Sequence, residues 1–205
     1  MNFTEAWKEQ RKGRFSLKWS QFFYAYDRHF ARFKDKKVNV LELGVAQGGS
    51  LQLWKRYFGR DSNIFGLDKN PDCKNVEEDR IKVFIGDQLD SNFVHEVFSS
   101  IGRVDIVIDD ASHDGEDQLN TFKLIFPMIP TGSVYSCEDL FVSYQNIGTN
   151  LFVDFINSEL VERMTFNNDR SCGVSCVSVY PGLVIMEKED IKVSRIKTGR
   201  RYDLR

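Results

Sequence analysis

Short apolar runs that alternate with helical patterns are the feature that most restricts the fold of this chain. Each run is rich in β-branched residues and ends near a glycine or an acidic side chain; the runs are residues 38–43, 63–67, 82–85, 104–108 and 133–137. Helical patterns lie between or after them, at residues 50–58, 92–100, 118–128 and 150–163. This alternation predicts parallel strands joined by crossover helices, and the nearly uninterrupted run at 104–108 predicts a buried central strand.

Two further patterns complete the predicted fold. Residues 174–180 and 183–187 are strand-like and flank Pro181-Gly182, which predicts an antiparallel hairpin closing one edge of the sheet. Residues 20–33 form an aromatic-rich helical pattern, and most of its rings are expected to pack on the sheet. The predicted fold class is α/β: a Rossmann-like, doubly wound, mostly parallel sheet with a C-terminal antiparallel hairpin. We expect one domain over residues 1–205, made of a helical cap segment (1–37), a Rossmann-like core (38–190) and a basic tail (191–205).

Composition restricts the class of partner and the compartment. The 28 Lys and Arg residues against 30 Asp and Glu residues give a net charge of −2, which disfavours a dedicated nucleic-acid binder. No uncharged stretch reaches the roughly 20 apolar residues that a bilayer span needs, and the first residues lack the apolar region of a signal peptide. Four cysteines are too few for a disulfide framework in 205 residues. We therefore expect a cytoplasmic protein without a membrane span or a nucleic-acid partner.

A glycine-containing loop follows the first predicted strand and reads Glu42-Leu-Gly44-Val-Ala-Gln-Gly48-Gly-Ser50. Glycine lets the backbone turn sharply and lets a ligand approach it closely. Asp68 ends the second strand, 24 residues after Gly44, about where an acidic side chain meets ribose hydroxyls in nucleotide-binding βαβ units. Loop and acidic strand end together predict a site for an adenosine-type ligand.

Two classes of ligand compete for that site. A dinucleotide fingerprint has glycine at its third position, where this chain has Ala46. The acidic Glu42 would repel a pyrophosphate placed on the following helix, but it suits the ammonium group of S-adenosylmethionine. Because one substitution in the loop does not exclude NAD, an NAD(P)-dependent oxidoreductase stays as the alternative enzyme.

The remaining strand ends carry a second set of acidic residues. Gly86-Asp87 follows the third strand, Asp109-Asp110-Ala-Ser-His113 follows the fourth, and Glu138-Asp139 follows the fifth. With Val40-Leu-Glu-Leu-Gly44 and Gly66-Leu-Asp68, these segments resemble the class I S-adenosylmethionine-dependent methyltransferases. Over roughly residues 16–140 the chain is similar to the metal-dependent sugar O-methyltransferases that modify macrolide deoxysugars and related glycans.

That resemblance implies a set of site residues. Asp110, Glu138 and Asp139 would hold Mg²⁺ or Mn²⁺, because three carboxylates make a hard, oxygen-rich site. His113 would act as general base, with Asp110 as the second catalytic residue. The cofactor-binding residues would be Glu42, Gly44, Gly48, Ser50, Asp68, Asp87, Gln88 and Asp109.

Strand alternation separates the roles within the Asp109-Asp110 pair, since neighbouring side chains point to opposite faces. We expect Asp109 on the cofactor side and Asp110 on the metal side, with the reverse assignment still open. The chain departs from the family at Ser16-Leu17-Lys18-Trp19, where relatives often carry Asp-Lys. No role is therefore predicted for Lys18.

The predicted function is S-adenosylmethionine- and divalent-metal-dependent O-methylation of a sugar or polyol hydroxyl. A cofactor-binding module without catalysis is the non-enzymatic alternative. Phe141, Tyr144 and Tyr135 are candidate stacking surfaces for the acceptor, and any homodimer would have to be built from the domain itself. Residues 192–205 hold six Lys and Arg residues against one Asp. This basic tail is either solvated or a fringe that attracts an anionic acceptor, such as a phosphorylated or nucleotide-linked sugar.

Overall fold

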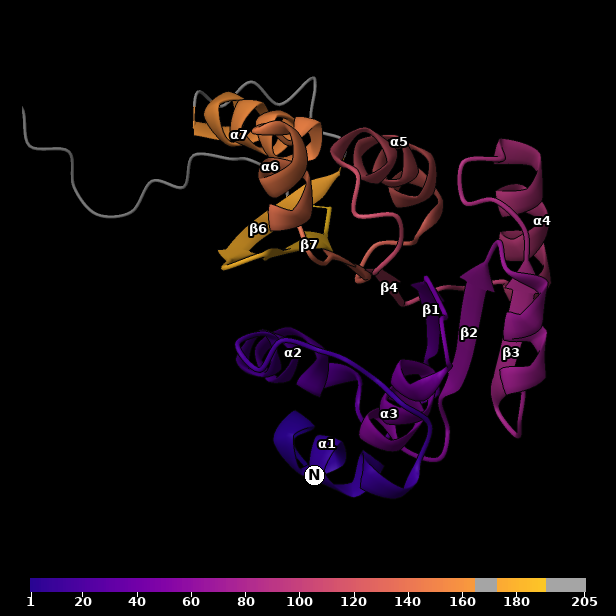
Figure 1. The fold of residues 1–205 in the computed structure, drawn as a ribbon. Coiled ribbons are helices and arrows are strands. Elements are labelled where there is room, and N and C mark those ends of the chain that lie inside the picture. The colour runs from indigo at the N-terminus through magenta and orange to yellow at the C-terminus, as the bar shows by residue number, and fades with distance from the viewer. Residues whose placement is uncertain (165–172, 191–205) are drawn as a thin grey trace, which may run out of the picture.

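A seven-stranded mixed sheet organises the part of the chain that the computed structural model describes, residues 1–164 and 173–190 (Figure 1). The strand order is β3-β2-β1-β4-β5-β7-β6. The strands are β1 (Asn39–Leu43), β2 (Asn63–Asp68), β3 (Ile81–Ile85), β4 (Ile106–Asp109), β5 (Val134–Cys137), β6 (Val174–Tyr180) and β7 (Leu183–Lys188). The five predicted parallel strands and the C-terminal hairpin are confirmed, and so is the predicted fold class.

The order of the strands reverses at β1, which places a crevice above its carboxyl end. β1 pairs in parallel with both β2 and β4, so that Leu43 lies beside Leu67 on one side and Asp109 on the other. In open α/β sheets, ligands bind at such a switch point, outside the carboxyl ends of the strands. β7 then runs antiparallel between β5 and β6, as the Pro181-Gly182 turn predicts.

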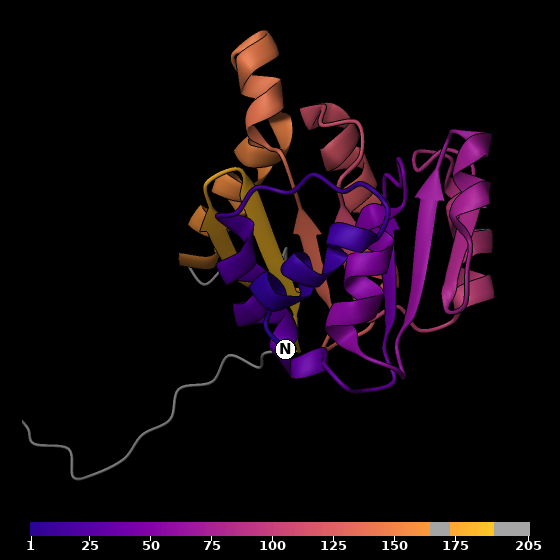
Figure 2. The same cartoon turned by 60° about the horizontal axis from the view of Figure 1, so that its bottom comes forward.

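Helices cover both faces of the sheet (Figures 1 and 2). α1 (Phe3–Glu9), α2 (Phe22–Phe30) and α3 (Gly49–Phe58) contribute to one hydrophobic core, and α4 (Ser91–Ile101), α5 (Gly115–Ile125) and α7 (Leu151–Met164) to the other. α6 (Phe141–Ile147) follows the fifth strand. The 3₁₀ turns are η1 (Gln10–Lys12), η2 (Ala31–Phe33), η3 (Pro71–Val76) and η4 (Phe126–Met128). None of the helices in the described part of the chain has the length and hydrophobicity that crossing a membrane requires.

The aromatic helix packs on the sheet as predicted and brings the N-terminal segment under the site. Phe22, Tyr26 and Phe30 of α2 are fully buried, whereas Tyr24 is largely exposed. Tyr26 lies edge-on to Trp54 of α3, with ring centroids 5.1 Å apart. Edge-to-face pairs of this kind stabilise a core beyond the area they bury. The aromatic core therefore fixes α2 against α1 and α3.

The structure differs from the predicted elements at several boundaries. α5 begins at Gly115, three residues before the predicted start, because the Asp114 side chain accepts hydrogen bonds from two backbone N–H groups of the first turn. Helix α6 is not among the predicted elements, since it is short and lacks a clear apolar period, whereas α1 falls within the predicted helical cap segment. The basic tail lies outside the described residues.

Candidate active site

A cavity of about 510 Å³ opens at the carboxyl ends of β1, β2 and β4. This volume is in the range of small-molecule and cofactor sites. The glycine loop after β1 lines it, together with Asp68, Gln88 and the segment from Asp110 to His113. Phe15, Ser16 and Leu17 close it from the N-terminal side. The cavity therefore brings together strand ends and one segment from outside the sheet.

Two positions in this loop require glycine, because other backbone segments lie directly against them. Gly44 has a φ of +85°, and a Cβ atom there would overlap the carbonyl oxygen of Asp110. Gly49 has no room either, because a Cβ would overlap the carbonyl oxygen of Phe15. Gly48 is the left-handed N-cap of α3 and is not among the cavity-lining residues. Of the three glycines, Gly44 and Gly49 line the cavity, and Gly48 shapes the loop.

Asp68 fastens the glycine loop to the end of β2. Its Oδ2 accepts hydrogen bonds from Val45 N at 2.8 Å and Ala46 N at 3.2 Å, and its Oδ1 accepts one from Asn70 N at 2.8 Å. Partial burial would raise the pKa of Asp68, but these backbone donors lower it below its ordinary value. The carboxylate is thus ionised and fixed at the cavity wall, where the sequence predicts it.

Gln88 and Asp87 follow β3 and point in different directions. Gln88 is buried, lines the cavity and donates from Nε2 to Thr121 Oγ1 at 2.9 Å. Asp87 is not among the lining residues; its Oδ2 lies 3.0 Å from Lys69 Nζ. A backbone hydrogen bond from Leu89 and the nearby Lys69 lower the pKa of Asp87. The structure therefore brings Gln88, but not Asp87, to the wall of the cavity.

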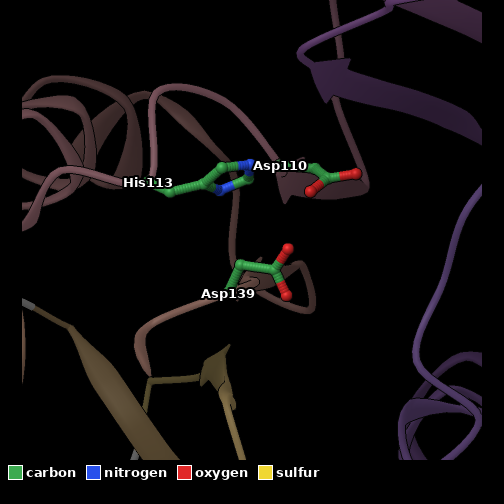
Figure 3. A group of neighbouring side chains, drawn as sticks. All are labelled: Asp110, His113 and Asp139. Carbon is green, nitrogen blue, oxygen red and sulfur yellow. The ribbon is translucent and has the colours of Figure 1, made fainter. Parts of the chain in front are cut away.

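Asp110, His113 and Asp139 converge at one end of the cavity (Figure 3). One ligand atom from each lies within 4.8 Å of the others, close enough to share a metal ion. His113 Nδ1 and Asp139 Oδ1 are buried and have no hydrogen-bond partner in the described part of the chain. Buried polar atoms in folded proteins nearly always have partners, so these two orphans point to a missing ligand. Two carboxylates and an imidazole fit a divalent cation.

The backbone at this group is strained. Ser112, His113 and Asp139 have φ values of +48°, +57° and +54°. A non-glycine residue in this region costs about 1–3 kcal/mol and persists only where its surroundings enforce it. With this backbone, the His113 and Asp139 side chains lie beside Asp110 (Figure 3).

Glu138 is separated from Asp139 and lies on the other side of the strand end. It is fully buried, with Oε1 accepting from Tyr26 Oη at 2.7 Å and Oε2 accepting from Lys18 Nζ at 2.8 Å. Burial raises the pKa of Glu138, and the Lys18 ammonium opposes that rise. Of the three predicted metal ligands, Asp110 and Asp139 belong to the group with His113, whereas Glu138 is linked to Asp110 through the Lys18 ammonium that both carboxylates contact.

Glu42 and Asp109, both predicted to bind the cofactor, are buried beneath the cavity and do not line it. Glu42 accepts hydrogen bonds from Ser50 Oγ at 2.7 Å and from Trp54 Nε1 at 3.1 Å, and of these residues Ser50 does line the cavity. Asp109 accepts from Tyr135 Oη at 2.7 Å, and burial raises the pKa of Asp109 to about 7. Both carboxylates hold the framework of the site.

Asp110 and Asp109 do separate as strand alternation predicts. Asp110 lines the cavity within the candidate metal group, whereas Asp109 points into the packed interior. Tyr135 was predicted as a stacking surface for the acceptor, and this prediction is wrong because its side chain is fully buried. Phe141 lies edge-on to the half-exposed Trp19, with ring centroids 5.6 Å apart.

Lys18 is the residue of this region that sequence reasoning missed. Its ammonium lies 2.6 Å from Asp110 Oδ2, 2.8 Å from Glu138 Oε2 and 3.4 Å from Glu42 Oε1. The side chain is almost inaccessible to solvent, and the three carboxylates raise the pKa of Lys18 against the lowering effect of burial. No local pattern could reveal these contacts, since the partners are 24, 92 and 120 residues away.

Known proteins with similar sequences are sugar O-methyltransferases of antibiotic pathways. Demethylmacrocin O-methyltransferase of Streptomyces fradiae is 40% identical over 136 residues, which are 63% of this chain and 33% of that protein. Mycinamicin VI 2''-O-methyltransferase of Micromonospora griseorubida is 40% identical over 126 residues, which are 58% of this chain and 31% of that protein. The chain thus matches about a third of the length of these curated relatives. No protein-family model matches it.

Solved structures with a similar fold include a methyltransferase of an antibiotic pathway. MycE methyltransferase from the mycinamycin biosynthetic pathway, in complex with Mg, S-adenosylhomocysteine and mycinamycin VI, matches with a TM-score of 0.81 at 28% identity. The match covers 100% of this chain and 57% of the MycE chain. A second MycE complex, with Mg and S-adenosylhomocysteine, matches with a TM-score of 0.78 over 92% of this chain and 55% of that one. The chain has the class I methyltransferase fold and resembles, in sequence and structure, the sugar O-methyltransferases of macrolide pathways.

Proposed function

We propose that this chain is an S-adenosylmethionine- and divalent-metal-dependent O-methyltransferase that acts on a hydroxyl of a sugar. The observation that carries the proposal is the convergence of Asp110, His113 and Asp139 at one end of the cavity. The similarity to MycE, whose structures contain Mg and S-adenosylhomocysteine, supports the same chemistry. No specific observation favours a nicotinamide oxidoreductase.

The cofactor is assigned to the cavity above the glycine loop. Asp68 is the proposed partner of the ribose hydroxyls, because it is ionised and fixed at the end of β2. Gln88 is the proposed contact at the adenine end, since its buried side chain lines the same wall. Ser50 and the backbone of Gly44 line the cavity near the methionine end. Glu42 acts there through Ser50 and not by lining the cavity.

The metal is assigned to Asp110 and Asp139. Oxygen-rich ligand sets favour Mg²⁺ or Mn²⁺ over zinc, and the orphaned Asp139 Oδ1 supplies an unused ligand atom. Glu138 as a third ligand stays a prediction, with both of its oxygens hydrogen-bonded in this structure. A divalent ion held here would lower the pKa of an acceptor hydroxyl that is otherwise almost wholly protonated at neutral pH.

His113 is the proposed general base. It lies within the same group as the two aspartates, and its Nδ1 has no hydrogen-bond partner in the described part of the chain. A base at this position would remove the acceptor proton as the oxygen attacks the methyl group in line, while the bond from that methyl to the sulfonium sulfur breaks and S-adenosylhomocysteine leaves. The rest of the barrier is lowered by orientation, which the cavity provides by holding both reactants on one rigid sheet edge.

Removal of divalent metal is expected to abolish methyl transfer. Purified chain treated with EDTA should lose activity toward a glycoside acceptor, and excess Mg²⁺ or Mn²⁺ should restore it, whereas Ca²⁺ is the control ion of larger radius. The measurement is S-adenosylhomocysteine release in a coupled assay. Equal activity with and without chelator contradicts the metal assignment.

Replacement of Gly44 by alanine is expected to weaken S-adenosylhomocysteine binding strongly. The added Cβ would overlap the Asp110 carbonyl oxygen, and residue 44 has a φ of +85°, which alanine rarely adopts. The loop must therefore move. Calorimetric titration with S-adenosylhomocysteine measures the loss. Gly102→Ala is the matched control, because that glycine also has positive φ (+80°) but its Cβ would meet nothing within 4 Å. Equal affinities in the two variants contradict the placement of the cofactor.

The finer predictions about partners remain proposals. A sugar-linked small molecule is the proposed acceptor, in line with the mycinamycin VI complex of MycE. A phosphorylated sugar, a homodimer and a cytoplasmic location are predictions from the sequence, and the tail on which the first of them rests lies outside the described residues. The separate division of the chain into cap, core and tail is likewise a proposal.

A further inference from the structure

We propose that Lys18 is a positioning residue that holds the acidic strand ends in place for metal binding and, through its own segment, the wall of the cofactor cavity. This inference rests on the proposed function. Lys18 is not among the residues that line the cavity, and its ammonium contacts carboxylates that follow or belong to three neighbouring strands: Glu42 on β1, Asp110 after β4 and Glu138 after β5.

The ammonium balances a concentration of negative charge that would otherwise be unstable. Removing the cation from such a buried cluster leaves uncompensated carboxylates, which repel one another at short range. Lys18 bonds to Asp110 at 2.6 Å and to Glu138 at 2.8 Å, and these bonds fix the direction of the Asp110 carboxylate beside His113 and Asp139. Groups that orient a metal ligand commonly change metal affinity without touching the metal.

The segment that carries Lys18 is fixed at both of its ends. At the other end, the Arg14 side chain donates to Val76 O at 2.7 Å, and Arg14 N donates to Gln52 Oε1 at 2.9 Å. Between these anchors, Phe15, Ser16 and Leu17 line the cavity. Phe15 and Leu17 are 67% and 79% exposed, so the segment has little packing of its own and depends on its two anchors. One lysine therefore connects the cavity wall to the metal group.

Two interpretations of Lys18 predict opposite changes in metal affinity when its charge is removed. A fixed positive charge next to a cation site disfavours a second cation, so its removal would tighten metal binding. Positioning predicts weaker binding instead. The sign of the change in metal affinity thus separates the two interpretations.

The test is the Lys18→Met variant, titrated with Mn²⁺ by electron paramagnetic resonance and with S-adenosylhomocysteine by calorimetry. We expect Mn²⁺ affinity to fall by about 10–100-fold, the usual effect of losing a group that orients a metal ligand. S-adenosylhomocysteine affinity should fall several-fold. Lys18→Arg, which keeps the charge, should recover part of the Mn²⁺ affinity. Arg14→Ala removes the side-chain bond of the other anchor to Val76 O and keeps the backbone bond to Gln52, so it should weaken S-adenosylhomocysteine binding and leave Mn²⁺ binding unchanged.

Two controls keep the test independent of stability. Phe33→Leu loosens the same hydrophobic core at a residue outside the ring pairs of Tyr26 and Trp54, and Lys36→Met removes an exposed lysine. Both should bind Mn²⁺ as the wild type does. If Lys18→Met does not fold, Lys18→Gln keeps hydrogen-bond donors without the charge and is titrated in its place. Wild-type or tighter Mn²⁺ affinity in the folded variant overturns the inference. A wild-type chain that binds neither ligand overturns the proposed function as well.

Discussion

Replacing Asp110 by alanine is expected to reduce methyl transfer by about a thousandfold, because loss of a metal ligand removes several kcal/mol of transition-state stabilisation. Asp110 is the residue that the metal group shares with the Lys18 cluster. S-adenosylmethionine binding should persist, since Glu42 and Glu138 still hold Lys18 and the cavity wall. Single-turnover rates give the loss in transfer, and calorimetry gives the cofactor affinity.

The comparison that makes this result specific is with Asp61→Ala, which removes an exposed carboxylate far from the cavity-lining residues. That variant should retain the wild-type rate. Asp110→Asn keeps the size of the side chain and loses its charge, and it should behave like the alanine variant. If Asp110→Ala loses cofactor binding in parallel with turnover, the carboxylate serves the cavity and not the metal.

Replacing His113 by glutamine is expected to lower kcat by about 10²–10⁴-fold, the usual contribution of a general base. Mn²⁺ affinity should stay near the wild-type value, because the two aspartates remain. His95→Gln is the matched control: that imidazole is exposed on α4 and accepts or donates within its own helix turn. Rates under saturating Mg²⁺ and a separate Mn²⁺ titration give the two quantities.

The two quantities also distinguish the two roles open to this imidazole. A parallel loss of Mn²⁺ affinity and kcat makes His113 a metal ligand, which contradicts its assignment as base. An unchanged kcat removes it from the chemistry altogether.

Local patterns were sufficient to predict the fold. Continuous β-branched runs, glycine after β1 and Pro181-Gly182 each report on a few neighbouring residues, and each is confirmed in the sheet. Asp68 was predictable for the same reason, because the end of a strand faces the switch point whatever surrounds it.

Side-chain direction at the strand ends was harder to predict. Glu138 and Asp139 are adjacent in sequence, yet one is buried against Tyr26 and the other faces His113. Alternation indicates that such neighbours separate, but which of them faces the cavity depends on partners elsewhere in the chain. The strained φ of Asp139 and the hydrogen bond from Tyr26 to Glu138 supply that information, and neither could be predicted from the sequence.

Lys18 shows most clearly which contacts could not be predicted from the sequence. Its partners come from three strand ends that meet only in the folded sheet, and its own segment lies outside the helical pattern of α2. The sequence signal at this place is the Asp-Lys pair of similar methyltransferases, and this chain has Leu17-Lys18 there, so no role could be predicted for the lysine. Only the tertiary structure reveals that it is buried among carboxylates.

The most direct test of the proposed chemistry is to follow a labelled methyl group. The chain is incubated with Mg²⁺, trideuteromethyl S-adenosylmethionine and a panel of deoxysugar glycosides, and the products are fragmented by mass spectrometry. We expect the trideuteromethyl group on a sugar oxygen of at least one glycoside, with release of S-adenosylhomocysteine. A folded chain that binds both S-adenosylmethionine and Mg²⁺ but labels no sugar, or labels only the aglycone, contradicts sugar O-methylation.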